Sequence, residues 1–281
     1  MNTVSTLPIS GHTKVVAIIA DPIAHVQTPQ LLNALLKQAG YDAVCVPMQV
    51  AADDLAGCID ALKKIKSISG AVITVPHKMA TAQLCAQIGP QAQVMGAVNA
   101  IHFNAERAVV GEMFDGKGFV QGLLNSNVAV NADLSVYIAG AGGVARGIAF
   151  ALLAQGVRRL SVYNRTTATA ESLVAALRAY APEADVQLAT DQPSAVDLCI
   201  NATSAGMLGL ETLQPFSLDG LNDQACVAEV VMQPEQTLLL QAAAAKGLKT
   251  VSGKQMLLAQ ISQLAAFTLN EPSLATLKLE D

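Results

Sequence analysis

The chain contains no tryptophan, and aromatic residues make up only 4% of its 281 residues. Charged residues are also scarce at 14%, and a net charge of −5 provides no basic surface for nucleic acid. Apolar residues, mostly alanine, leucine, valine and isoleucine, reach 52%, which excludes intrinsic disorder. This composition favours α/β layers over an aromatic-rich binding module.

Long apolar runs are missing as well. No uninterrupted stretch of about 18 apolar residues exists, and residues 1–14 lack the apolar core of a secretory signal. We therefore expect a cytoplasmic protein with no membrane partner. The five cysteines are widely spaced and form no C-x-x-C pair, and the four histidines lack metal-ligand spacing. We expect buried thiols, no disulfide framework and no metal site.

Strands and helices alternate along the whole chain, and its length suits one large or two medium domains. The pattern predicts a mostly parallel sheet in each half, with a first domain over 1–115 and a second over 116–251. Predicted strands are 15–20, 43–48, 70–75, 98–103, 108–114, 186–189, 196–201, 225–231 and 248–251, and predicted helices are 29–39, 53–64, 79–88, 117–124 and 253–269.

The stretch from Val136 to Arg146 has the form of a dinucleotide-binding turn. An apolar strand runs into Gly140-Ala141-Gly142-Gly143-Val144, followed by an apolar helix. The first glycine suits the tight turn, the second lets the backbone approach a pyrophosphate, and Ala145 takes the small third position. Exposed N–H groups at the start of the helix would hold the phosphates.

The next predicted strand ends in Asn164-Arg165-Thr166. Sites for NAD usually place an acid near this point to bind the ribose 2′-hydroxyl, whereas sites for NADP place an arginine near the 2′-phosphate. Since no acid is present, the pattern favours NADP, with NAD tolerated. The alternative interpretation is that Arg165 is a solvated loop residue.

Two residues with acid–base chemistry follow predicted strands. Lys78 comes after the strand that ends in Val75-Pro76, and Asp115 comes after the strand over 108–114. Open α/β sheets bind ligands at the carboxyl ends of their strands. A lysine beside an aspartate can exchange a proton with a substrate hydroxyl while a nicotinamide carries hydride. An exposed lysine at a helix start and a turn aspartate remain the alternative.

Several short motifs, taken together, resemble the shikimate dehydrogenase family. They occur in the order and with the spacing of that family over about residues 15–268, which is far more specific than any one of them. The motifs are Gly70-Ala-Val-Ile-Thr74-Val-Pro-His-Lys78, Gly96-Ala-Val-Asn99, Asp115-Gly-x-Gly118-Phe, Gly140-Ala-Gly-Gly143, Asn164-Arg-Thr166, Asn201-Ala-Thr-Ser-Ala-Gly-Met207 and Met256-Leu-x-x-Gln260.

The resemblance implies an enzyme that interconverts 3-dehydroshikimate and shikimate, or a close cyclic hydroxy acid, with NADP or NAD. It implies a substrate domain built from 1–115 plus 252–281 and a Rossmann domain over 116–251, as a monomer or homodimer. By the same resemblance Lys78 and Asp115 would be the catalytic pair. Substrate-binding residues would be Thr28, Thr74 (in the strand before Lys78), Asn99 and Gln260, and the nicotinamide side would hold Asn201, Thr203, Met207 and Gly253.

The departures from the family pattern concern the substrate carboxylate. The family places two serines where this chain has Val26 and Thr28, and a tyrosine where it has Met232. Val72 and Phe114 also replace polar family residues. A charged group that loses hydrogen-bond donors binds less well. The alternatives are therefore a quinate-type or amino-shikimate-type dehydrogenase, and a catalytically silent dinucleotide-binding regulator.

Overall fold

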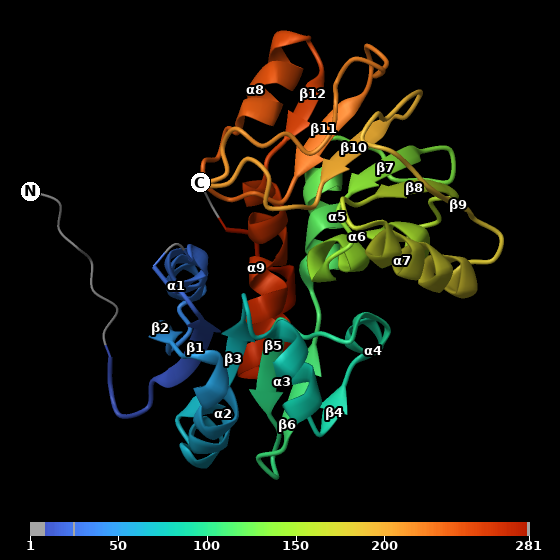
Figure 1. Ribbon diagram of the computed structural model, residues 1–281. Coiled ribbons are helices and arrows are strands. Elements are labelled where there is room, and N and C mark those ends of the chain that lie inside the picture. The colour runs from blue at the N-terminus through green and yellow to red at the C-terminus, as the bar shows by residue number, and fades with distance from the viewer. Residues whose placement is uncertain (1–8, 25, 280–281) are drawn as a thin grey trace, which may run out of the picture. The chain divides into compact units, whose positions relative to one another are not determined.

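The computed structural model describes residues 9–24 and 26–279 (Figure 1). The chain divides into two compact units, one formed by residues up to Phe114 together with those from Gln260 onward, the other by Asp115–Ala259. The final long helix, α9 (Gly253–Leu269), therefore begins in the second unit, and its residues from Gln260 belong to the first. None of the described helices is long and apolar enough to cross a membrane.

The first unit contains a six-stranded sheet in the order β2-β1-β3-β5-β6-β4. Within it β5 alone runs antiparallel to its neighbours, so the predicted mostly parallel sheet is confirmed. Its elements are β1 (Lys14–Ala20), α1 (Thr28–Gln38), β2 (Ala43–Gln49), α2 (Leu55–Lys64), β3 (Ile68–Ile73), α3 (Lys78–Leu84), β4 (Gln87–Ile88), α4 (Pro90–Met95), β5 (Ala100–Phe103) and β6 (Val109–Glu112), with 3₁₀ turns at Ala52–Asp54 and Pro272–Thr276.

The central strand β1 shows why this sheet is covered on both faces. Its last five residues, Val16–Ala20, are fully buried, so both its side-chain rows face apolar neighbours. On one face Ala17, Ile19 and Ile73 belong to a core that also takes residues from α2, α4, β5 and β6. The ends of the strands in this buried sheet carry the candidate site residues.

The predicted helix over 79–88 and the predicted strand over 70–75 both need correction. Helix α3 ends at Leu84, and Gln87–Ile88 form a short strand parallel to β6, with which they pair at Val110 and Gly111. The apolar side chains in this segment are compatible with a helix or a strand, and pairing with the edge of β6 favours the strand. Strand β3 ends at Ile73, so Thr74 lies just after the strand instead of within it.

One arginine in the first unit donates hydrogen bonds to the C-terminal end of a helix that is distant in the sequence. Arg107 lies in the β5–β6 turn with a φ of 61°. Its guanidinium donates to the main-chain carbonyls of Leu62, Lys63, Ile65 and Ile68 at 2.8–3.2 Å. The last carbonyls of a helix lack partners inside it, so Arg107 satisfies groups at and beyond the end of α2.

We expect Arg107→Ala to lower the free energy of unfolding by about 2 kcal/mol, because four hydrogen bonds to main-chain carbonyls are lost. The loss stays this small because several of these carbonyls would bond to water instead of staying unpaired. Arg107→Gly should lose about 1 kcal/mol less, since glycine adopts a positive φ without strain. Urea unfolding of both variants measures the two values. Wild-type stability in Arg107→Ala would contradict this role.

The second unit contains a six-stranded, fully parallel sheet in the order β12-β11-β10-β7-β8-β9. Numbered from β7, this is the 3-2-1-4-5-6 order of dinucleotide-binding folds, with the reversal between β7 and β10. The elements are α5 (Asp115–Asn125), β7 (Ser135–Ala139), α6 (Gly143–Ala154), β8 (Arg159–Tyr163), α7 (Thr167–Tyr180), β9 (Asp185–Leu188), β10 (Leu198–Asn201), β11 (Cys226–Glu229), α8 (Leu238–Ala245) and β12 (Lys249–Val251).

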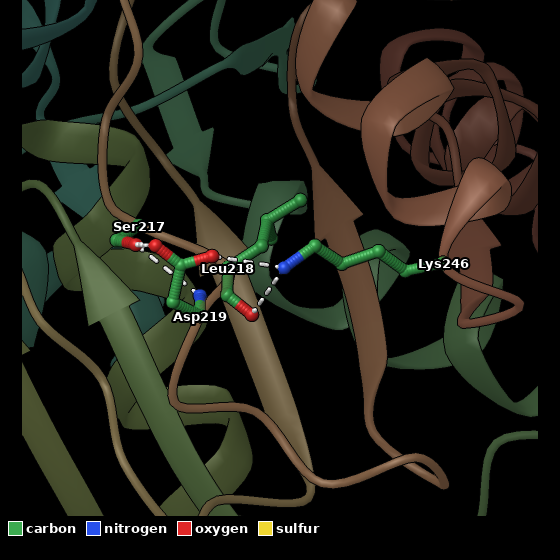
Figure 2. A network of polar contacts seen from close by, with 4 residues as sticks. All are labelled: Ser217, Leu218, Asp219 and Lys246. Carbon is green, nitrogen blue, oxygen red and sulfur yellow. Dashed lines mark hydrogen bonds and ion pairs between the residues drawn. The ribbon is translucent and has the colours of Figure 1, made fainter.

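A polar contact network joins the end of α8 to the loop that precedes β11. Lys246 donates to the Leu218 carbonyl at 3.4 Å and forms an ion pair with Asp219 at 2.9 Å (Figure 2). The Ser217 hydroxyl donates to the other oxygen of the same carboxylate at 3.2 Å. Because the lysine sits in the helix C-cap position, its charge also suits the negative end of the helix dipole.

Candidate functional site

The carboxyl ends of β1 and β3 bring several predicted substrate residues to one edge of the first sheet. Ile19 and Ile73 are paired neighbours, and the Thr74 N–H donates to the Ile19 carbonyl at 3.0 Å. Thr28, 7% exposed, begins α1 after β1. Asn99 directly precedes the antiparallel β5, and its carbonyl accepts the Ile73 N–H at 2.8 Å. Antiparallel entry of β5 thus places Asn99 at the same edge as Thr74.

A buried chain of amides fixes how Asn99 and Gln260 are oriented. The Phe114 N–H donates to Asn99 Oδ1 at 2.8 Å, and Asn99 Nδ2 donates to Gln260 Oε1 at 3.3 Å. A backbone N–H can only donate, so it assigns the oxygen of Asn99 and, in turn, the oxygen of Gln260. The Gln260 NH₂ group is therefore left as a donor for a ligand oxygen. Both side chains are at least 95% buried, so the orientation is well constrained.

Lys78 is held by its main chain at the start of α3. Its carbonyl accepts the Val98 N–H at 3.0 Å, and the turn before it closes through His77 N–H to Thr74 carbonyl at 2.9 Å. The His77 ring, 1% exposed, contacts the Val50 carbonyl through Nε2 at 2.9 Å. Because a carbonyl only accepts, Nε2 carries the proton. The sequence did not predict this structural role of His77. The available signal was a polar side chain between the motif residues Pro76 and Lys78.

Asp115 begins α5 and is 2% exposed. A carboxylate in the first turn is favoured by the positive end of the helix dipole. The sequence predicted a helix only over 117–124, and the helix instead starts at Asp115 itself. Lys78 belongs to the first unit and Asp115 opens the second, so their pairing stays a prediction.

The departures from the family pattern fall into two kinds. Val72 and Phe114 are buried, 4% and 8% exposed, and Phe114 packs edge-on against Phe267 with ring centroids 5.4 Å apart. These two residues act in packing. Val26 is only half-buried, two positions before Thr28, and Met232 is half-buried in the second unit. Among the residues of the first unit that differ from the family pattern, Val26 is thus the one whose side chain is partly accessible to a ligand.

The glycine turn of the second unit has room for a phosphate group. Gly140 has a φ of 116°, and a β-carbon there would lie 2.7 Å from the Ala202 carbonyl oxygen, so only glycine fits. At Gly142 and Gly143 a β-carbon would meet nothing within 4 Å, and both are exposed at the start of α6. The first N–H groups of this helix have no acceptor within it. These residues fit a dinucleotide pyrophosphate.

The end of β8 presents the residues predicted for the 2′-phosphate. Arg165 and Thr166 are exposed, and Asn164 Nδ2 donates to the Thr166 carbonyl at 3.0 Å, which shapes the turn into α7. Thr169, where the family carries a second arginine, is also exposed. A single guanidinium is thus available at this turn to an incoming phosphate.

Asn201 organises the segment after β10. Its Oδ1 accepts the N–H and hydroxyl of Thr203 at 3.1 and 2.7 Å, and its Nδ2 donates to the Ala205 carbonyl at 2.9 Å. Met207, 38% exposed, ends this segment. Gly253 is buried, and a β-carbon there would overlap the Val231 carbonyl, so close packing against the residues that follow β11 requires glycine.

The cysteines are not placed for chemistry. Burial raises the pKa of Cys45 and Cys199 to about 12 and that of Cys85 and Cys226 to about 11. Cys58 and Cys85 are partly exposed, which corrects the expectation that all five would be buried. In residues 9–24 and 26–279, no group of three or more His, Cys, Asp or Glu side chains is placed to hold a metal ion.

Comparisons with known proteins match both halves of the chain. Residues 18–101 match the sequence model described as the shikimate dehydrogenase substrate binding domain, and residues 123–213 match that of shikimate/quinate 5-dehydrogenase. A protein of Lysinibacillus sphaericus (strain C3-41) named shikimate dehydrogenase (NADP(+)) is 35% identical over 87% of this chain and 88% of its own length.

Two solved structures show the same fold. The ligand-free 5-ketofructose reductase of Gluconobacter sp. strain CHM43 matches with a TM-score of 0.84 and 29% identity, covering 95% of this chain and 98% of that protein. Shikimate 5-dehydrogenase of Listeria monocytogenes, in complex with shikimate and NAD, matches with a TM-score of 0.85 and 26% identity over 94% of each chain.

Proposed function

Because the chain belongs to the shikimate dehydrogenase family of oxidoreductases, we propose that it interconverts shikimate and 3-dehydroshikimate with NADP in the cytoplasm. The observation that carries this proposal is the buried Asn99–Gln260 pair, which leaves an amide donor for a substrate oxygen. It lies in the unit that also holds Thr28, Thr74 and Lys78. The second unit supplies a glycine turn that fits a dinucleotide.

We assign the proton transfer to Lys78 and Asp115. When bound, a nicotinamide dinucleotide would supply the hydride-transfer chemistry at the substrate carbon. In reduction the Lys78 ammonium would give a proton to the carbonyl oxygen, and in oxidation the neutral Lys78 amine would take a proton from the hydroxyl. Asp115 is the second member of the pair. Gln260, Thr28 and Thr74 would orient the ring hydroxyls of the substrate through neutral hydrogen bonds.

In the second unit we assign the pyrophosphate to the main chain of Gly140–Val144, including Ala141, at the start of α6. Asn164, Arg165 and Thr166 would meet the adenosine ribose and its 2′-phosphate. The ordered segment Asn201–Met207 with Thr203, and Gly253, would line the nicotinamide side. These assignments follow the family motifs residue by residue.

Replacing Arg165 should separate the two cofactors. We expect Arg165→Ala to weaken NADP binding roughly tenfold, because the exposed guanidinium makes one charge-assisted contact worth about 1.5 kcal/mol. NAD, which lacks the 2′-phosphate, should keep its affinity. Calorimetric titration of both cofactors measures this, with Arg158→Ala, an exposed arginine at the other end of β8, as the control. An equal loss for NAD and NADP would contradict the assignment.

A second candidate function is reduction of a neutral polyhydroxy ketone. Val26 gives the chain an apolar side chain two residues before Thr28, where a carboxylate would need donors. The similar 5-ketofructose reductase is named for a substrate that carries hydroxyl and carbonyl groups but no carboxylate. The neutral donors of Gln260 and Thr28 suit such a substrate equally well.

One screen distinguishes these functions. NADPH oxidation is followed with 3-dehydroshikimate and 5-ketofructose, and NADP+ and NAD+ reduction with shikimate, quinate, an amino-substituted shikimate and simple polyols. Turnover of shikimate and 3-dehydroshikimate supports the main proposal, and preference for 5-ketofructose supports the second. Preference for quinate or the amino compound would show that the substrate is a different cyclic hydroxy acid. Tight dinucleotide binding without any turnover would instead indicate a regulator.

A further inference from the structure

A buried carboxyl group in the second unit has no role in the proton transfer described above. Glu229, the last residue of β11, is 0% exposed. Its Oε2 accepts the Thr237 hydroxyl proton at 3.0 Å, while its Oε1 has no hydrogen-bond partner within the described part of the chain. A buried acid with an unpaired oxygen is costly, so we looked for what it supports.

Glu229 is connected to both ends of the segment Thr203–Met207, through Asn201 at one end and Thr237 at the other. It is the strand partner of Asn201, and the next N–H, of Val230, donates to the Asn201 carbonyl at 3.1 Å. Thr237, which Glu229 holds, is the N-cap of α8 and accepts the N–H of its third residue at 3.2 Å. The Thr237 side chain also lies against Gly206: a β-carbon there would be 3.3 Å from it.

The surroundings of this carboxyl are uncharged. Segment 202–207 and helix α8 carry no titratable residue. On β10 the nearest titratable group is the Cys199 thiol, whose pKa burial raises to about 12. Lys249 of β12 donates to a main-chain carbonyl, and Glu235, after β11, forms an ion pair with Lys254 at 3.5 Å. Among the described residues, then, none supplies a cation to neutralise an ionised Glu229.

We propose that Glu229 is a positioning residue for the segment Thr203–Met207, which it holds through Thr237 and Asn201, and that this hold weakens as the solution becomes alkaline. An ionised carboxylate at this place would be a buried charge with only neutral donors, the Thr237 hydroxyl and the Asn201 amide, and this disfavours the closed segment. Opening of the segment would hydrate the charge. That this segment contacts the nicotinamide side of the cofactor rests on the proposed function.

The pKa of Glu229 agrees with this geometry. Burial raises it from 4.5 to about 7, against the smaller opposing effects of the Thr237 hydroxyl and the Asn201 amide. An acid with a raised pKa in the closed state stabilises that state most below pH 4.5. The stabilisation is lost as the pH rises toward about 7. The closed segment should therefore be more protected at pH 6 than at pH 8.

Amide hydrogen exchange of the full chain without cofactor tests the proposal directly. After correction for intrinsic rates, wild-type protection over 201–207 should fall about tenfold from pH 6 to pH 8, while β7 changes little. Glu229→Gln should abolish this fall, and the matched variant Glu235→Gln should keep it. The same fall in Glu229→Gln, or no fall in the wild type, would overturn the proposal.

A second variant keeps the test valid if Glu229→Gln does not fold. Thr237→Val removes the hydroxyl that lowers the pKa of Glu229, so the loss of protection should shift to higher pH; an unchanged midpoint would overturn the proposal. Calorimetric binding of NADP+ at pH 6 and pH 8 then adds the cofactor. The ratio of wild-type to Glu229→Gln Kd should be several-fold larger at pH 8. If no variant binds NADP+, the proposed function fails, and the exchange result alone decides on Glu229.

Discussion

Lys78→Ala should lower kcat by roughly 10²–10⁴, the usual contribution of a general acid–base group. The expected result follows from the position of Lys78 at the start of α3, where its main chain is fixed by Val98 and by the buried His77. Removal of the side chain leaves these main-chain contacts in place. The loss should therefore appear in turnover and not in folding, and steady-state kinetics with the preferred substrate measures it.

Cofactor affinity provides the internal control for this variant. The glycine turn that fits the pyrophosphate lies in the other unit, so NADP+ should bind Lys78→Ala with a nearly unchanged Kd. Lys66→Ala, an exposed lysine of the same unit, should keep wild-type kcat. Near wild-type turnover in Lys78→Ala would remove this lysine from the mechanism.

Val26→Ser should lower the KM for shikimate by roughly ten- to a hundredfold, since a hydrogen bond to a charged group contributes about 1.5–3 kcal/mol. The side chain is half-buried and precedes α1 closely, where Thr28 offers a hydroxyl of its own. A serine at 26 would add a second hydroxyl for a substrate carboxylate. A neutral ketone such as 5-ketofructose has no carboxylate and should gain little.

The matched variant Val26→Ala distinguishes a new donor from new space. Alanine removes the same methyl groups but adds no hydroxyl, so its KM for shikimate should stay close to that of the wild type. An equal fall of KM in Val26→Ala and Val26→Ser would show that the valine acts by bulk. A wild-type KM that neither variant changes would place the carboxylate elsewhere.

Local sequence patterns predicted most elements correctly where the pattern is compatible with only one type of secondary structure. The apolar run at 15–20 and the glycine turn after Val136 predicted β1 and the opening of the dinucleotide unit, and both form. The predicted helix over 79–88 was wrong at its C-terminal end, because short apolar stretches fit a helix or a strand equally well. The partner strand, β6, is distant in the sequence and decided the matter.

The sequence by itself determined the α/β class and the identity of the candidate chemical groups, since glycine turns, strand ends and motif order are local properties of the chain. Only the tertiary structure decided which way the Asn99 and Gln260 amides point, because their orientation depends on the Phe114 N–H, fifteen residues from Asn99. It also decided that Glu229 is buried without a cation. Burial and hydrogen-bond partnership arise from contacts between distant segments, and no local pattern encodes them.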